Sequence, residues 1–338
     1  MPRPDGPDTH EGAWTSGRNA GLDAGRAVAA ACVVFVHTNA AVMLEGIAYS
    51  QIGYVGVPFF AAAAVVFMVR RVFNGVGSAA IVSMSVRRLL RPFAIWSAIY
   101  FIVRYVLSGW IVNGVAPRVS WTDVLHGAGG WHLWFLPFIL CVGLAAMVAA
   151  KVAARSVAAT GVIIGLSLVS AGLLVGLHTS SPESVARNVL VRWPFELPVA
   201  LVALAVGLSI ERRWLVLPRR GRVSAAFWCC FVLLVACGTI VSDDGSRRLA
   251  QAAGVAMLLA CLTWPTVRVP SWLVHLGSMG FGVYVVHYLF QLASSRVVDG
   301  DGVVTPAEGL AAFFLTLIGS FVAVWVLERI PVARRLLP

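Results

Sequence analysis

The sequence predicts an all-α, polytopic integral membrane protein with about ten transmembrane helices and with both termini in the cytoplasm. Of its 338 residues, 59% are hydrophobic and only 12% are charged, which is typical of a membrane-embedded chain and not of a soluble core. Apolar runs of about 20 residues, the length that crosses a bilayer, recur along the chain. The net charge of +11 comes from basic clusters between these runs, as in cytoplasmic loops, so we expect no nucleic acid partner.

The apolar runs give the expected order of the spans. They cover residues 22–44, 52–69, 92–110, 129–151, 156–177, 193–210, 223–241, 249–264, 271–292 and 307–327. Pro92 suits the first turn of the third span. An even number of spans places both termini on one side of the membrane. Eighteen of the 26 Lys and Arg residues fall on that side and six on the other, so the positive-inside rule makes it the cytoplasmic side.

The chain divides into one large unit and two short tails. Residues 1–20 are rich in Pro, Gly and polar side chains, so we expect a disordered cytoplasmic tail. Residues 21–330 form a single transmembrane domain, and residues 331–338 form a short basic cytoplasmic tail. The first apolar run is long enough to remain in the membrane, so no cleavable signal peptide is expected. The six cysteines lie in apolar runs without CxxC or zinc spacing, which predicts reduced packing residues and no metal site.

The first span carries Asp23, Arg26 and His37, and such groups inside a membrane segment indicate function by default. Arg26 and His37 are eleven residues apart, so in a helix they differ by roughly 20° after three turns and by roughly 16 Å along the axis. Asp23 is close enough to pair with Arg26. A neutral histidine here can take a proton from an attacking hydroxyl or act as a nucleophile. The alternative is an anchoring salt bridge and a histidine bonded to a neighbouring helix.

A second group of candidates is the basic stretch Arg87-Arg88-Leu89-Leu90-Arg91 before the third span. Arg88 and Arg91 are three residues apart, so they share a helical face. Two guanidinium groups on one face suit phosphates, because each can bind bidentately. By spacing alone, a positive-inside clamp or an anionic lipid site is the favoured alternative.

Two further stretches combine aromatic and titratable side chains. His132 and Trp134 stand at the entrance of the fourth span, where an aromatic ledge with a polar group suits a sugar or another hydroxylated acceptor. A membrane-interface aromatic belt is the simpler interpretation of that stretch. Tyr284 and His287 are three residues apart in the ninth span, after glycines that permit close helix packing. A packing helix with hydrogen-bonded polar tips is an equal alternative for this pair.

Together, these motifs resemble the membrane-bound acyltransferase type 3 family in its stand-alone form. Members open with Leu-Asp-x-x-Arg and an Arg-x10-His motif, which are matched by Leu22 to Arg26 and by Arg26 to His37. Arg88 and Arg91 match the family's Arg-x-x-Arg motif. The stretches 132–135 and 277–287 are similar to later family features. Two positions depart from the pattern: Phe59-Phe60 lacks a following Ser-Gly, and Gly280-Phe281 replaces Ser-Tyr.

The resemblance implies acyl transfer across a bacterial inner membrane. The donor would be acyl-CoA, commonly acetyl-CoA, with its phosphates at Arg88, Arg91 and Arg87. His37 would be the general base or transient acyl acceptor, and Arg26, oriented by Asp23, would position the donor. The acceptor would be a hydroxyl of a glycan, a glycolipid or another hydroxylated compound, near His132, Trp134, Tyr284 and His287. The competing hypothesis is a proton-coupled transporter or flippase, since embedded His, Glu and Arg also suit proton relays.

Overall fold

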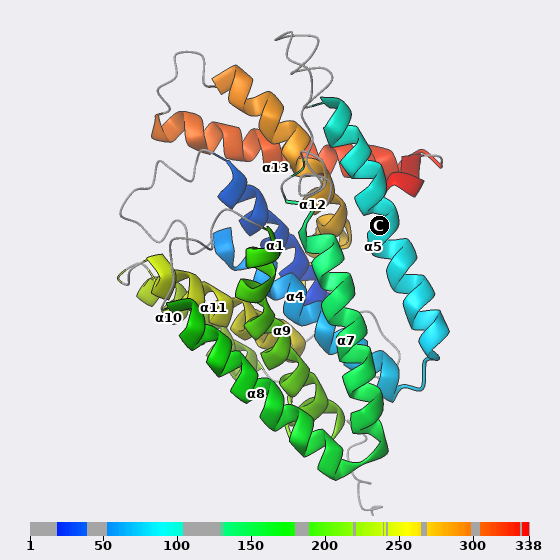
Figure 1. Cartoon of the computed structure of the whole chain (residues 1–338). Coiled ribbons are helices and arrows are strands. Elements are labelled where there is room, and N and C mark those ends of the chain that lie inside the picture. Colours follow the sequence, from blue (N-terminus) through cyan, green and yellow to red (C-terminus); the bar gives the residue numbers. More distant parts are fainter. Residues whose placement is uncertain are drawn as a thin grey trace, which may run out of the picture.

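The computed structural model describes residues 19–38, 53–103, 130, 132–179, 189–218, 221–238, 240, 243–264, 269–298, 305–331 and 333–337. Within these ranges every regular element is a helix (Figure 1). The helices are α1 (Ala20–His37), α4 (Gly56–Phe73), α5 (Ser78–Phe101), α7 (Phe135–Arg155), α8 (Val157–Thr179), α9 (Val189–Glu211), α10 (Gly221–Gly238), α11 (Asp243–Thr263), α12 (Ser271–Val298), α13 (Pro306–Arg329) and the short η4 (Ala333–Leu336).

The predicted all-α membrane architecture is confirmed. Each of the ten expected spans overlaps one of the long helices, and eight of these are long and apolar enough to cross a bilayer, namely α1, α4, α7, α8, α9, α10, α12 and α13. The other two are more charged: α5 carries three arginines in its middle, and α11 carries charged residues in its N-terminal turns. The expected ends of the first and third spans, residues 39–44 and 104–110, lie outside the described residues. The predicted N-terminal tail lies almost wholly outside them as well.

One predicted helix boundary is wrong. The sequence predicts a helix that begins at Pro92, but α5 begins at Ser78 and continues through that proline. Proline has no backbone N–H, so the carbonyl of Arg88 loses its usual partner within the helix. Only residues 74–77 separate α4 from α5. The long helix places the basic stretch in its middle and not at its start.

Local sequence accounts for the ends of the first and last long helices. The side chain of Asn19 caps α1 by accepting a hydrogen bond from the backbone N–H of Leu22 at 3.1 Å. Thr305 and Glu308 form a reciprocal capping box at the start of α13, and the intervening Pro306 occupies its first turn. Both helices therefore start where the sequence satisfies their otherwise unpaired backbone N–H groups.

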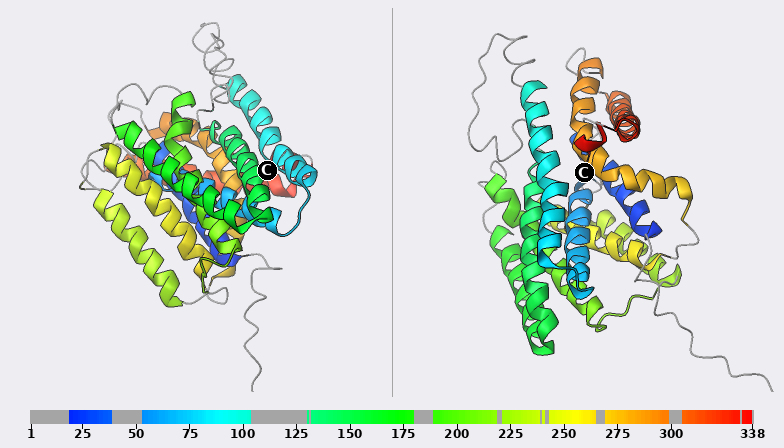
Figure 2. Two further views of the ribbon diagram at one scale, coloured as in Figure 1. Left: turned by 60° about the horizontal axis from the view of Figure 1, so that its bottom comes forward. Right: turned by 90° about the vertical axis from the view of Figure 1, so that its right-hand side faces the viewer.

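The core lies where α1, α4, α7 and α12 meet. Helix α1 packs against α12, α4 and α11, while α4 packs against α7 and α9 as well (Figure 1). Helices α8 and α10 lie at the periphery (Figure 2), and their candidate spans are only 17% buried. Exposed leucines such as Leu166 and Leu173 on α8 suit contact with lipid. The outer helices therefore present apolar side chains outward, whereas buried titratable groups such as Asp23 and His287 lie on the inner helices.

Candidate active site

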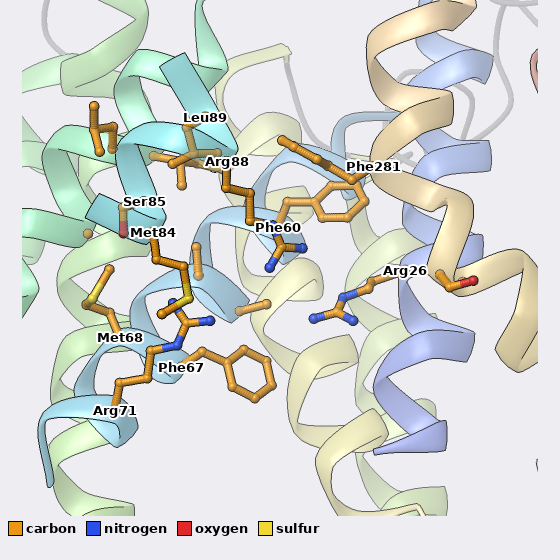
Figure 3. A pocket seen from close by; sticks show the side chains of 17 residues that line it. Arg26, Phe60, Phe67, Met68, Arg71, Met84, Ser85, Arg88, Leu89 and Phe281 are labelled. Atoms are coloured by element: carbon orange, nitrogen blue, oxygen red, sulfur yellow. The ribbon is translucent and has the colours of Figure 1, made fainter. Parts of the chain in front are cut away.

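Five helices line a partly open cavity of about 220 Å³ into which three arginines project. Arg26 enters from α1, Arg71 from the last turn of α4, and Arg88 from the middle of α5 (Figure 3). The other lining residues are mostly apolar, and no Asp or Glu is among them. They are Phe60, Ala63, Ala64, Phe67, Met68, Met84, Ser85, Leu89, Ile139, Leu140, Gly143, Gly277, Ser278 and Phe281. A cavity with this lining suits a ligand that is anionic in one part and apolar in another.

The predicted pairing within α1 is present. Nη1 of Arg26 donates to Oδ1 of Asp23 at 2.8 Å, and the Asp23 side chain is buried whereas Arg26 is partly exposed. The Asp23 carboxylate thus holds the guanidinium group of Arg26, and Arg26 also lines the cavity. The guanidinium carbon of Arg26 also lies 5.9 Å from the ring centre of Phe67. Both contacts limit the directions in which Arg26 can point.

The basic stretch of α5 divides between two surroundings. Arg88 lines the cavity, and its guanidinium carbon lies 6.0 Å from the ring centre of Phe281 on α12. All three arginines of the stretch are exposed, but Arg87 and Arg91 are not among the residues that line the cavity. The predicted role of Arg87 and Arg91 in donor binding therefore receives no support from the cavity, and it stays a prediction.

At the far end of α1 the structure brings three histidines together. They come from α1 (His37), from the turn that precedes α7 (His132) and from α12 (His287). The ring centroid of His37 lies 5.2 Å from that of His287 and 6.1 Å from that of His132. The rings of His132 and His287 are 4.6 Å apart. The sequence predicts separate sites for His37 and the other two, one catalytic and one for the acceptor; the fold joins them in one histidine cluster.

Backbone carbonyls fix the tautomers of two of these rings. Nδ1 of His287 lies 2.7 Å from the carbonyl oxygen of Tyr284, and Nε2 of His132 lies 3.4 Å from that of Val285. Because a carbonyl only accepts, the nitrogen that faces it carries the hydrogen. In the neutral rings, Nε2 of His287 and Nδ1 of His132 are then bare acceptors. Both atoms are buried and have no hydrogen-bond partner among the described residues.

A series of contacts between aromatic rings links the cavity to the histidine cluster. Phe281, which lines the cavity, stacks almost parallel on Tyr284, with ring centroids 6.1 Å apart and planes 6° apart. The ring of Tyr284 lies 5.5 Å from that of His132, and its hydroxyl donates to the His132 backbone carbonyl. The ring sequence Phe281, Tyr284, His132 therefore leads from the arginines to the histidines without a break.

A comparison with protein families now adds to this geometry. The family model described as an acyltransferase domain, that of the membrane-bound acyltransferase 3 family, matches residues 19–325. The chain belongs to this family. The match covers every long helix except the last residues of α13, and it confirms the resemblance on which the site prediction rests. Comparisons with curated proteins and with solved structures gave no match.

One of the predicted acceptor residues, Trp134, has no ring contact with the three histidines in the described part of the acyltransferase. The side chain of Trp134 is buried, and its ring packs against Phe135 and Phe138 at 5.7 and 5.8 Å. The ring of His132, two residues earlier, lies against α12, where its Nε2 faces the carbonyl of Val285. The other predicted acceptor residues, Tyr284 and His287, both lie at the cluster.

Sequence reasoning missed two side chains of the candidate site. Tyr100 of α5 donates from its hydroxyl to the carbonyl of Val285 at 2.7 Å, and its ring lies 5.3 Å from that of His132. No sequence pattern marks it. From the sequence, Arg71 is only part of the basic end of the second span, because consecutive arginines at that position fit the positive-inside rule. Asn39, Arg104 and Trp131, three other polar or aromatic residues of these stretches, lie outside the described residues.

No group of three His, Cys, Asp or Glu able to hold a metal ion occurs in the described part of the chain.

Proposed function

We propose that this acyltransferase moves an acyl group, acetyl in the first instance, from cytoplasmic acyl-CoA to a hydroxyl of an extracytoplasmic or lipid-linked glycan in a bacterial inner membrane. The observation that carries the proposal is the chain of ring contacts, Phe281 to Tyr284 to His132, that links an arginine-lined cavity to the histidine cluster. The arginines would receive the charged end of the donor. The histidines would meet its thioester and the acceptor hydroxyl.

The donor would enter from the cytoplasmic side with its phosphates at Arg88. Guanidinium groups bind phosphates bidentately, and Arg26, held by Asp23, would position the chain beyond them. The cavity of about 220 Å³ is below the roughly 300–1,000 Å³ of pockets that enclose a drug-sized ligand. It would therefore hold one part of the donor while the nucleoside stays outside, where the exposed Arg87 and Arg91 would be within reach of its phosphates.

The thioester would reach His37 through the pantetheine arm. Arg26 and His37 are roughly 16 Å apart along α1, a length that an extended arm of this type can cover. The phenyl rings of Phe60 and Phe281 line the cavity and would pack against the uncharged methylene and amide groups of the arm. Exclusion of water from such a route would protect the thioester from hydrolysis.

The reaction is a nucleophilic substitution at the thioester carbonyl. His37 takes the proton of the acceptor hydroxyl while the hydroxyl oxygen attacks the carbonyl carbon. A C–O bond forms, the C–S bond breaks, and the leaving CoA sulfur receives the proton that His37 held. The products are the acyl ester and CoA thiol. In the alternative route His37 first accepts the acyl group itself and then passes it to the hydroxyl.

The acceptor would meet the second half of the histidine cluster. Bare acceptor nitrogens on His132 and His287 suit hydrogen bonds from hydroxyl groups, of which a sugar presents several. Tyr284 holds the His132 backbone and so fixes the position of this half. A hydroxyl-rich acceptor fits these nitrogens better than an apolar one, because an apolar acceptor would leave them unsatisfied.

Replacement of His37 tests the proposal. Purified protein in nanodiscs is titrated calorimetrically with acetyl-CoA, and transfer of labelled acetyl is then followed in membranes that contain the native acceptor. We expect His37→Ala to lower transfer by about 100-fold or more, since a general base contributes about that factor, while donor affinity and folding stay as in the wild type. His275→Ala, an exposed histidine on the same helix as His287, is the matched control and retains activity.

Two results would contradict the proposal. Full transfer by His37→Ala would remove His37 from the reaction. Accumulation of a labelled solute in proteoliposomes without release of CoA would support a transporter instead.

A further inference from the structure

We propose that Arg71, at the end of α4, is a third phosphate-binding cation of the donor cavity and acts there together with Arg26 and Arg88. Neither the motif resemblance nor the predicted site includes this residue. The inference depends on the proposed function for the identity of the donor. It goes further by naming the part of the donor that this cavity selects, which is a multiply charged phosphate group.

The geometry of the cavity is the first support. Arg26, Arg71 and Arg88 come from three different helices, α1, α4 and α5, and all three line the same space. Figure 3 shows their guanidinium groups turned toward that space and away from the surrounding ribbon. Three separate chain segments would not each direct a cation into one small cavity if the arginines served only as surface anchors.

The charges of these groups are the second support. Arg26 and Arg71 carry the same positive charge as Arg88 and repel it electrostatically. Asp23 pairs with Arg26, but no carboxylate is among the residues that line the cavity. Like charges held together in a partly buried site repel, and an anion placed between them removes the repulsion. The lining therefore favours a ligand with more than one negative charge.

The neighbouring residue Arg70 shows that Arg71 does not simply mark a membrane boundary. Both arginines lie in the last turn of α4. The charge of Arg70 acts on Glu211 at the end of α9, whereas Arg71 lines the cavity. Consecutive residues in a helix point about 100° apart, so one turn of α4 serves two surroundings. Arg70 thus provides a matched control with the same charge and nearly the same depth in the membrane.

The chemistry of the cavity indicates which phosphate is bound. A guanidinium group forms two parallel hydrogen bonds with a phosphate, and three such groups suit adjacent phosphates. The diphosphate that joins the nucleoside to the pantetheine arm has this form. The apolar lining from Phe60 and Phe67 would then face the uncharged start of the arm. The headgroup of an anionic lipid offers the same phosphate chemistry, so the test has to distinguish the two sources.

The test compares three ligands in nanodiscs made of uncharged, zwitterionic lipid. Coenzyme A carries the diphosphate and the 3′-phosphate, dephospho-coenzyme A carries the diphosphate alone, and pantetheine carries neither. We expect Arg71→Ala to weaken binding of both phosphorylated ligands by about tenfold or more, the usual effect of losing a charge-assisted contact. Pantetheine affinity, measured by the same calorimetry, stays unchanged. Arg71→Lys keeps the charge without the planar guanidinium group and restores part of the affinity.

Arg70→Ala is expected to bind all three ligands as the wild type does, and the thermal unfolding temperature of each variant reports whether it is folded. If the wild type binds coenzyme A and Arg71→Ala binds it equally well, the inference is wrong while the proposed function stands. If the wild type binds no coenzyme A at all, the proposed function fails first, and the donor role of Arg71 with it. If mass spectrometry instead finds an anionic lipid that only Arg71→Ala loses, the phosphate belongs to a lipid and the donor assignment is overturned.

Discussion

Replacement of Gly277 by alanine is expected to disable the site by separating α12 from α1. A Cβ atom at this position would overlap the backbone carbonyl of Asp23, and a Cβ atom at Gly280 would lie 2.9 Å from the carbonyl oxygen of Arg26. The two glycines therefore allow the backbones of α1 and α12 to meet beside the residues that hold the cavity. The added carbon would meet backbone atoms, so no side chain can rotate to relieve the overlap.

The size of the effect follows from these contacts. A carbon and a carbonyl oxygen normally stay about 3.3–3.6 Å apart, so at Gly277 the helices have to part by about 1 Å or more. Overpacking of this kind costs about 1–3 kcal/mol of stability. Arg26 moves with α1 relative to Arg88 on α5, and a misplacement of about 1 Å can lower turnover about 100-fold. Gly280→Ala needs a smaller shift and should lose less of both.

Thermal unfolding in nanodiscs, coenzyme A affinity and acetyl transfer are measured for these two variants and for Gly172→Ala. Gly172 lies on the peripheral helix α8, and a Cβ atom added there would meet nothing within 4 Å. Its substitution should therefore be neutral or should stabilise the helix by up to about 1 kcal/mol. A Gly277→Ala protein with wild-type unfolding temperature, affinity and transfer rate would refute the argument. The approach of α12 to α1 would then not determine the site.

Three other substitutions test separate parts of the structure. Tyr284→Phe removes the hydroxyl that donates to the His132 carbonyl. We expect a loss of about 1–3 kcal/mol in stability and slower transfer, with unchanged coenzyme A affinity. Unchanged stability would contradict the buried hydrogen bond. Arg88→Ala is expected to weaken coenzyme A binding more than Arg91→Ala, because only Arg88 lines the cavity, and calorimetry that ranks them in the opposite order would support the motif-based prediction. Trp96→Phe removes the 2.9 Å bond from the indole nitrogen to the Leu336 carbonyl, and faster proteolysis of the C-terminal segment is the expected result.

The sequence is sufficient for the architecture because apolar runs of bilayer length are a strong signal. It also identifies the pairing of Asp23 with Arg26, which are neighbours on one helix turn. The helix through Pro92 could not be predicted, since a proline in a soluble helix marks a boundary whereas packing can keep it inside a membrane helix.

Contacts between helices are beyond the reach of sequence patterns. Nothing in the sequence states that His132 and His287 lie beside His37, because α1, α7 and α12 are far apart in the chain. The same limit applies to Arg71 and Arg88, which come from consecutive helices but face one cavity only after α4 and α5 pack. Helical spacing can show which residues share a face, but it cannot show which faces meet.

The site is organised by a pair of parallel helices more than by α1 alone. Gly277 and Gly280 of α12 approach Asp23 and Arg26, and His287 lies beside His37, so the two helices run in the same direction. The first and ninth of ten predicted spans should indeed share a direction across the membrane. From Gly277 to His287 is roughly 15 Å along the axis, close to the roughly 16 Å from Arg26 to His37. Each helix thus carries one end of the proposed route at the cavity and the other at the histidine cluster, and their backbone contact keeps both ends in register.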